Sequence, residues 1–198
     1  SNDMFKRVEN NINLAHMENE ISNYWDEIDA FQTSLNNRNN DKVFRFYDGP
    51  PFPTGSPHYG NLLAGVIKDI VPRYWTMRGY YVERRFGWDV HGLPIEMEVQ
   101  KNLNLEDPQQ IDEYGIDKFN EACRTQVQTN TENWEKITRK IGRWVDFEND
   151  YNTMDIDFME SVWWVFKELW EKELIYQDYK VLPYSWAAST PLSNFEAN

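Results

Sequence analysis

The chain has 198 residues, 40% of them hydrophobic and 16% aromatic, which is enough apolar material for one or two folded domains. No apolar run approaches the roughly 20 residues of a membrane-spanning helix, so no membrane partner is predicted. The formal net charge of -13 argues against broad nucleic-acid binding by this stretch, and the single cysteine, Cys123, excludes an internal disulfide and a thiolate metal cluster.

The first predicted element is an amphipathic helix over residues 20–35. Its apolar side chains recur at helical spacing and gather on one face, while the polar run "NNRNNDK" that follows ends the pattern. We therefore expect an N-terminal helical extension over residues 1–40 and a second domain over residues 41–198. No targeting signal is expected at the N-terminus, and a cytoplasmic location agrees with the cysteine content.

A strand, a helix and a second strand are predicted next. Residues 43–47 form an apolar run typical of a buried strand, residues 62–77 have helical period, and residues 80–85 form another strand. Pro72 should kink the helix or begin a new turn. The spacing of about 30 residues is that of a right-handed βαβ unit with parallel strands, so the fold class is α/β.

Further helices should follow the second strand. Helical period covers residues 94–103 and 116–141, and Pro108 suits the first position of a short helix between them. Asp155 suits the N-cap of another helix, and residues 176–182 are predicted as a further strand.

The stretch "FYDGPPFPTGSPHYGN" joins the first strand to the helix. Gly49, Gly55 and Gly60 allow close approach of the backbone, and four prolines make the loop stiff. A rigid turn that only caps the sheet and a ligand-binding loop are both compatible with this composition. The loop matches neither a P-loop nor a dinucleotide-binding glycine pattern.

His58 and Asn61 lie at i and i+3 where the helix should begin. Two neutral donors beside a helix N-terminus suit a triphosphate, because the first turn of a helix presents unbonded N–H groups to anions. The alternative is that His58 is only a helix cap or a surface residue.

Four blocks of the sequence resemble a known family. "PPFPTGSPHYGN" is similar to the "HIGH" signature of class I aminoacyl-tRNA synthetases, and "GWDVHGLPIE", "KDIVPRYWTMRGY" and "TPLSNFEA" narrow the resemblance to the isoleucyl-tRNA synthetases. The resemblance runs from "YWDEIDAFQTSL" almost to the last residue. It implies the first half of a Rossmann-like nucleotide-binding domain, ending near the start of an editing insertion.

The resemblance also implies which residues bind ATP. His58 and Asn61 match the catalytic positions of the first signature, with Asn61 in place of the commoner second histidine; asparagine is still a neutral donor, of shorter reach. Gly60 matches the small residue against which adenine lies. The remaining ATP-binding positions are Pro51, Thr54 and Gly55.

The amino-acid substrate is assigned in the same way. The carbonyl group of Pro50 and the carboxylate of Asp89 would hold the substrate ammonium group, with Gly49 and His91 as further substrate-binding residues. Asp89 could instead cap the following helix, and His91 could instead support its loop. Cys123 is expected to be inert.

The reaction implied is activation of isoleucine by ATP and transfer to tRNA(Ile), with Mg²⁺ as a cofactor for which this segment shows no metal site. The second signature, "KMSKS", is absent, so we expect little activity from this segment alone and expect tRNA to bind mainly elsewhere. A valyl-type synthetase and a truncated, non-catalytic binding module remain alternatives. From the residues alone, the acid pair Asp89 and Glu96 would also suit a glycoside hydrolase.

Overall fold

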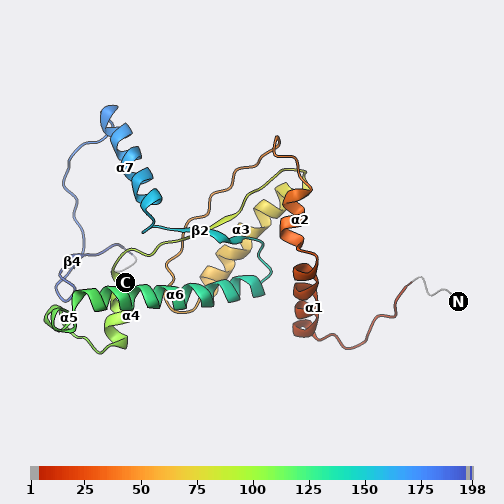
Figure 1. The fold of residues 1–198 in the computed structure, drawn as a ribbon, viewed down its shortest axis with the longest axis horizontal. Coiled ribbons are helices and arrows are strands. Elements are labelled where there is room, and N and C mark those ends of the chain that lie inside the picture. Colours follow the sequence, from red (N-terminus) through yellow and green to blue (C-terminus); the bar gives the residue numbers. More distant parts are fainter. Residues whose placement is uncertain (1–4, 195–196, 198) are drawn as a thin grey trace. The chain divides into compact units, whose positions relative to one another are not determined.

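A computed structural model describes residues 5–194 and 197 of the chain (Figure 1). The described residues divide into two compact units. The first contains those of Ser1–Pro50, Gly55–Gly87 and Thr131–Asp150, and the second contains those of Pro51–Thr54, Trp88–Asn130 and Tyr151–Asn198. The domain boundary predicted after residue 40 stays a prediction.

The N-terminal helix is divided in two, which corrects the single helix predicted over residues 20–35. Helix α1 covers Leu14–Glu27 and helix α2 covers Ala30–Asn36. Between them Asp29 adopts a left-handed backbone conformation with φ of 47°, which an α-helix cannot continue through. The sequence predicted one helix because the apolar side chains of the two helices keep the same helical spacing on both sides of Asp29.

The first predicted strand is reduced to a single bridge. Val43 pairs in parallel with Tyr81, through hydrogen bonds from Phe44 N–H to the Tyr81 carbonyl (3.1 Å) and from Tyr81 N–H to the Lys42 carbonyl (2.8 Å). The parallel direction is therefore confirmed, but a regular strand over residues 43–47 is wrong. Further along, Pro50 and Pro51 lack the N–H groups that a ladder needs, so pairing could not continue through them.

Helix α3, Tyr59–Met77, runs through Pro72 without interruption. Of the two outcomes predicted at Pro72, a kink or the start of a new turn, the second is therefore wrong. Pro72 is buried, and its carbonyl accepts a hydrogen bond from the Thr76 hydroxyl. Trp75, one turn later, stacks on Phe44 with ring centroids 4.8 Å apart. This packing holds the last turn in place despite the hydrogen bond that a proline cannot donate.

The second strand was predicted over residues 80–85, but the regular strand lies further along the chain, as β1, Arg85–Trp88. It pairs with β2, Asp146–Asn152. The Arg84 carbonyl accepts from Asp146 N–H (2.7 Å) and the Trp88 carbonyl accepts from Thr153 N–H (3.1 Å). Both partners advance in the same direction along the chain, so the two strands run parallel.

The helices predicted after the second strand are present with nearly the predicted bounds. They are α4, Leu93–Asn102; α5, Pro108–Tyr114; α6, Ile116–Lys140; and α7, Ile156–Glu171. Pro108 opens α5 and Asp155 is the N-cap residue of α7, as predicted, although no side-chain hydrogen bond caps α7. The α/β class is confirmed.

The strand predicted over residues 176–182 is wrong. The only pairing near it is a short antiparallel hairpin of β3, Tyr184–Ser185, with β4, Thr190–Pro191, among the residues that the structure describes. Tyr179 and Val181 are almost fully exposed in this stretch. Residues 176–182 mix apolar and polar side chains, and a segment with no partner strand among the described residues gains little from extended structure.

Each unit has its own apolar centre. In the first, Val82 and Phe86 are buried, and Phe86 stacks on Phe147 with centroids 4.7 Å apart. The buried Arg84 lies over the ring of Phe31, and burial lowers its pKa to about 10. The second unit buries Trp88, Val90, Ile95, Val99 and Phe119. No helix in the described part of the chain meets the length and apolarity of a membrane span.

Candidate active site

The N-terminus of α3 is closed by a reciprocal pair of hydrogen bonds between His58 and Asn61. The Asn61 N–H donates to Nδ1 of His58 (3.3 Å), and the His58 N–H donates to Oδ1 of Asn61 (3.0 Å). This is a capping box, in which each side chain satisfies the other residue's backbone. The alternative that His58 is a helix cap is therefore confirmed, and capping does not exclude a second role.

Capping fixes which atoms of these side chains remain for a ligand. Because Nδ1 of His58 accepts a hydrogen bond, the neutral imidazole carries its proton on Nε2, which is then a donor. Asn61 likewise uses its oxygen in the cap and keeps its amide NH₂ group. Tyr59 and Gly60 add two backbone N–H groups that precede the first intrahelical bond, from Leu62 to His58. All four are neutral donors at the positive end of a helix, which favours an anion.

Gly60 is needed where the imidazole folds over the helix. A Cβ atom at this position would lie 2.9 Å from Cε1 and 3.1 Å from Nδ1 of His58. The ring therefore occupies the space that any other residue would fill. Gly60 was predicted as the small residue beside adenine, and the structure adds that it accommodates the capping ring.

The turn before α3 is held against the C-terminal half of α6. Gly55 has φ of 56°, a left-handed conformation that suits glycine, and its carbonyl accepts from the indole N–H of Trp134 (3.1 Å). The Ser56 hydroxyl accepts from the side-chain amide of Asn133 (3.0 Å). Trp134 and Asn133 were not predicted, because no local pattern indicates a contact this distant in sequence.

A buried carboxylate anchors the start of the loop. The Asp48 side chain is 1% exposed and pairs with Arg143 (Nη2 to Oδ2, 2.5 Å) and with Lys68 (Nζ to Oδ1, 2.6 Å). Lys68 also donates to the Gly49 carbonyl (3.0 Å). The peptide that precedes Pro50 is thus tied to α3 and to the turn between α6 and β2.

In the second unit the proline loop meets the end of β1. The Asp89 N–H donates to the carbonyl of Pro51 (2.8 Å). Thr54 is half-buried, and its N–H donates to the Phe52 carbonyl in a tight turn (2.9 Å). Pro51 and Thr54 therefore contribute backbone geometry here.

The carboxylate of Asp89 is half-buried, and the described residues give it no hydrogen bond or ion pair. It does not cap α4, because the N-cap residue of that helix is Gly92 and no side chain bonds there. The capping alternative is therefore wrong. A partly desolvated carboxylate without a protein partner is suited to bind a cationic group of a ligand.

His91 is exposed, and its Nδ1 lies 2.8 Å from the hydroxyl oxygen of Thr153. That hydroxyl also accepts from Val90 N–H (3.1 Å). The ring therefore has a structural partner, which favours the supporting role left open from the sequence. Thr153 is a further residue that the sequence did not indicate.

The predicted site residues fall into two groups. Gly49, Pro50, Gly55, His58, Gly60 and Asn61 belong to the first unit, whereas Pro51, Thr54, Asp89 and His91 belong to the second. The roles assigned to them stay predictions. The structure brings together His58 with Gly60 and Asn61, and Pro51 with Asp89.

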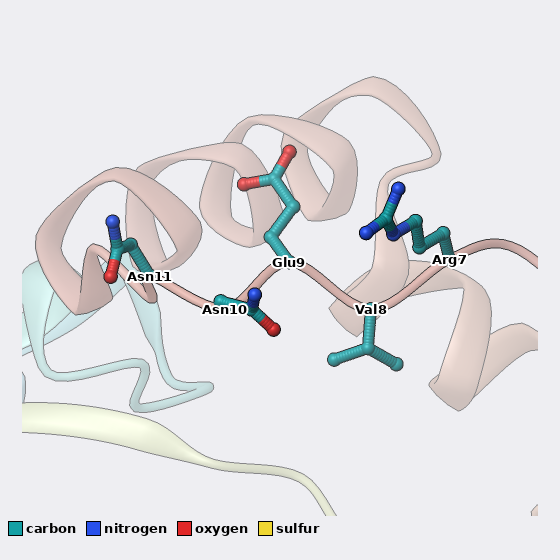
Figure 2. A pocket seen from close by; sticks show the side chains of 5 residues that line it. All are labelled: Arg7, Val8, Glu9, Asn10 and Asn11. Carbon is teal, nitrogen blue, oxygen red and sulfur yellow. The ribbon is translucent and has the colours of Figure 1, made fainter.

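Two pockets of the first unit lie apart from these residues. One of about 460 Å³ lies along the extended segment of residues 7–11, where Figure 2 shows Val8 and Glu9 pointing in opposite directions. The other, of about 700 Å³, lies among α1, α2, the end of α6 and β2. Neither is lined by a predicted site residue.

The described residues provide neither a metal-binding cluster nor a reactive thiol. Among the described residues, no group of three or more histidine, cysteine, aspartate or glutamate side chains is placed to hold a metal ion. Burial, and then the charge of Glu96, raises the pKa of the Cys123 thiol. A thiol that resists ionisation is a poor nucleophile, as expected for an inert cysteine.

Comparison with solved structures supports the fold. The agnB2 LeuRS of Agrobacterium radiobacter K84, solved as a ternary complex with tRNA and LeuAMS, matches 89% of this chain and 20% of its own with a TM-score of 0.55. At 21% sequence identity this likeness concerns the fold alone. It agrees with the Rossmann-like α/β start of a class I catalytic domain predicted from the sequence.

Sequence comparison gives the family. The cytoplasmic isoleucine–tRNA ligase of Arabidopsis thaliana is 57% identical over 93% of this chain, and that of Bdellovibrio bacteriovorus is 54% identical over 98%. The chain spans 16% and 18% of the length of these relatives. The profile of the family described as "tRNA synthetases class I (I, L, M and V)" matches residues 20–198. The chain therefore belongs to the class I tRNA synthetases of the isoleucine, leucine, methionine and valine group.

Proposed function

We propose that a full-length synthetase carrying this chain activates isoleucine with ATP and transfers the isoleucyl group to tRNA(Ile). Isoleucine is favoured over the other amino acids of the group because relatives named as isoleucine–tRNA ligases are 51% to 57% identical to the chain. The observation that carries the proposal is the half-buried Asp89 carboxylate, which has no protein partner in the described residues.

Asp89 is proposed to bind the ammonium group of isoleucine. Its N–H is bound to Pro51, so the backbone position is fixed while the carboxylate is left for the ligand. An ammonium–carboxylate hydrogen bond is roughly twice as strong as one between neutral groups, which suits recognition of a feature that all amino acids share. The Pro50 carbonyl is proposed as a second acceptor for the same group.

His58 and Asn61 are proposed to bind the phosphates of ATP. The isoleucine carboxylate oxygen forms a bond to the α-phosphorus as the bond to the pyrophosphate oxygen breaks, and pyrophosphate leaves. No enzyme nucleophile is needed, so the contribution of these residues is to position the phosphates and to stabilise charge. Nε2 of His58, the Asn61 amide and the N–H groups of Tyr59 and Gly60 are donors of the right kind.

Mg²⁺ would supply charge neutralisation for the phosphates in such a reaction. The described residues do not fit a protein-held Mg²⁺ site, since no cluster of three suitable side chains is present among them. No step is therefore assigned to the metal through this chain. Contact with tRNA is proposed to lie mainly in other regions, and a cytoplasmic location is proposed in line with the name of the Arabidopsis relative.

The test is amino-acid-dependent exchange between ATP and pyrophosphate by a full-length synthetase that carries this chain. Exchange should depend on isoleucine, with valine supporting it less well. A preference for valine would assign the valyl-type alternative, and no exchange with any amino acid would favour the non-catalytic module. His58→Ala should lower isoleucine-dependent exchange about tenfold or more, which corresponds to about 1.4 kcal/mol.

A further inference from the structure

Trp88 and Val90, the residues on either side of Asp89, each form a hydrogen bond with Thr153, which lies at the end of the neighbouring strand β2. Thr153 follows β2, is buried at 9% exposure, and belongs to the same unit as Asp89. Its N–H donates to the carbonyl of Trp88 (3.1 Å), and its hydroxyl oxygen accepts from Val90 N–H (3.1 Å). The residues on both sides of Asp89 are thus fixed by Thr153.

The same hydroxyl extends the contact to His91. Its oxygen lies 2.8 Å from Nδ1 of the imidazole, and the tautomer of His91 decides which of the two groups donates the hydrogen bond. Together with the bond from Asp89 N–H to Pro51, four hydrogen bonds surround Asp89 and none involves its carboxylate. These contacts restrain the backbone and leave the charged group available.

We propose that Thr153 is a positioning residue for amino-acid recognition, which fixes the direction of the Asp89 carboxylate through Val90, His91 and Trp88. This inference rests on the proposed function. A loop that must be ordered when the ligand binds reduces affinity, and a misplacement of about 1 Å is enough to impair a site of this kind. The hydroxyl of Thr153 is buried beside the loop that it orders, so it acts through Asp89 and does not require ligand contact.

The test compares two variants of similar shape in a full-length synthetase carrying this chain. Thr153→Val removes the hydroxyl and keeps the volume, whereas Thr153→Ser keeps the hydroxyl. Thr153→Val should raise the KM for isoleucine about fivefold or more and leave the KM for ATP within about twofold, with Thr153→Ser within about twofold of wild type for both. Thr138→Val, which removes another buried threonine hydroxyl, controls for a general loss of packing.

The contribution of His91 is measured in a double-mutant cycle. His91→Ala and Thr153→Val should together raise the isoleucine KM by less than the product of their separate effects, because both disrupt one hydrogen-bonded unit. If the two effects on the isoleucine KM multiply fully, His91 and Thr153 act independently and His91 has no part in the positioning of Asp89.

Three results would overturn the role of Thr153. They are equal behaviour of the valine and serine variants, a joint rise in both KM values, and an effect of Thr138→Val of the same size. If Thr153→Val does not fold, Thr153→Cys, of similar size and with a much weaker hydrogen-bonding sulfur, takes its place under the same criteria. A wild-type protein without isoleucine-dependent exchange would instead refute the proposed function, so the two failures are distinguishable.

Discussion

The backbone N–H of Asp89 donates a 2.8 Å hydrogen bond to the carbonyl of Pro51. This bond joins the proline-rich loop to the end of β1 inside one unit. Proline cannot donate from its own backbone, so at this position it serves as an acceptor on a stiff segment. Two of the four sequence blocks that carry the family resemblance, "PPFPTGSPHYGN" and "GWDVHGLPIE", therefore share a defined contact beside the carboxylate proposed to bind isoleucine.

Gly60→Ala should weaken ATP binding without unfolding α3. The new Cβ would displace the His58 ring and open the capping box, at a cost of about 1 kcal/mol, while alanine gains about as much over glycine inside a helix. The melting temperature should change little, whereas the KM for ATP should rise about threefold or more.

Gly65→Ala in the same helix is the matched control for this prediction. Its Cβ would lie 3.5 Å from Cδ1 of Ile141, an ordinary contact, and far from the cap in sequence. Equal ATP kinetics for the two variants would show that the imidazole position is irrelevant to ATP.

Breaking the Asp48–Arg143 pair should loosen the start of the loop. Asp48→Asn leaves the buried Arg143 guanidinium with a neutral partner, and loss of one member of a buried ion pair typically costs about 3 to 5 kcal/mol. Hydrogen exchange should become faster at the amides of residues 44–49 in a full-length synthetase. Unchanged protection there would contradict the anchoring role of Asp48.

Lys68→Met should impair amino-acid binding and should cost less stability than Asp48→Asn. Asp48 keeps Arg143 as its partner, and Lys68 is 28% exposed, but the Gly49 carbonyl loses its donor beside Pro50. The KM for isoleucine should rise about threefold or more, and Lys68→Arg should restore most of the affinity.

Arg78→Met, which removes an exposed cation at the other end of α3, is the control for net charge. If it raised the isoleucine KM as much as Lys68→Met, the bond to Gly49 would have no specific role.

Cys123 should react slowly with iodoacetamide near neutral pH. Its pKa in the folded protein lies above the ordinary thiol value of 9.0, because burial and then the charge of Glu96 disfavour the thiolate. The folded state therefore holds this proton more tightly than the unfolded state, so its stabilising effect is complete below pH 9 and declines as pH rises further.

The alkylation rate at pH 8, compared with that of the denatured chain, measures this shift. Glu96→Gln should speed the reaction of the folded protein by removing the second cause. A folded protein that reacts as fast as the denatured one would contradict the assignment.

Local signals in the sequence predicted most of the fold. Pro108 and Asp155 mark helix starts because the first helical turn tolerates a missing N–H and favours an acidic side chain. Three predictions were wrong where neighbours decide the outcome, and one of them, the strand over residues 176–182, has no partner strand among the described residues. Residues 43–47 have the composition of a strand, but they form only one bridge, from Val43 to Tyr81. The break in the N-terminal helix depends on the left-handed backbone conformation of Asp29, which the spacing of apolar residues does not indicate.

The candidate site was predictable where its residues are close in sequence. His58 and Asn61 share a helix turn, so spacing alone placed them together. Thr153 and Trp134 were missed because each contacts a loop that is distant in sequence, and neither belongs to a motif. Long-range partners of this kind follow from strand pairing and helix packing, which a single sequence specifies only weakly.

The most direct test of the central claim is the steady-state kinetics of Asp89→Asn in isoleucine-dependent exchange by a full-length synthetase that carries this chain. The substitution keeps the shape of the side chain and removes its charge. The account predicts a rise of about tenfold or more in the isoleucine KM, equivalent to about 1.4 kcal/mol, with the ATP KM within about twofold of wild type. An unchanged isoleucine KM would contradict the claim that this carboxylate binds the substrate ammonium group.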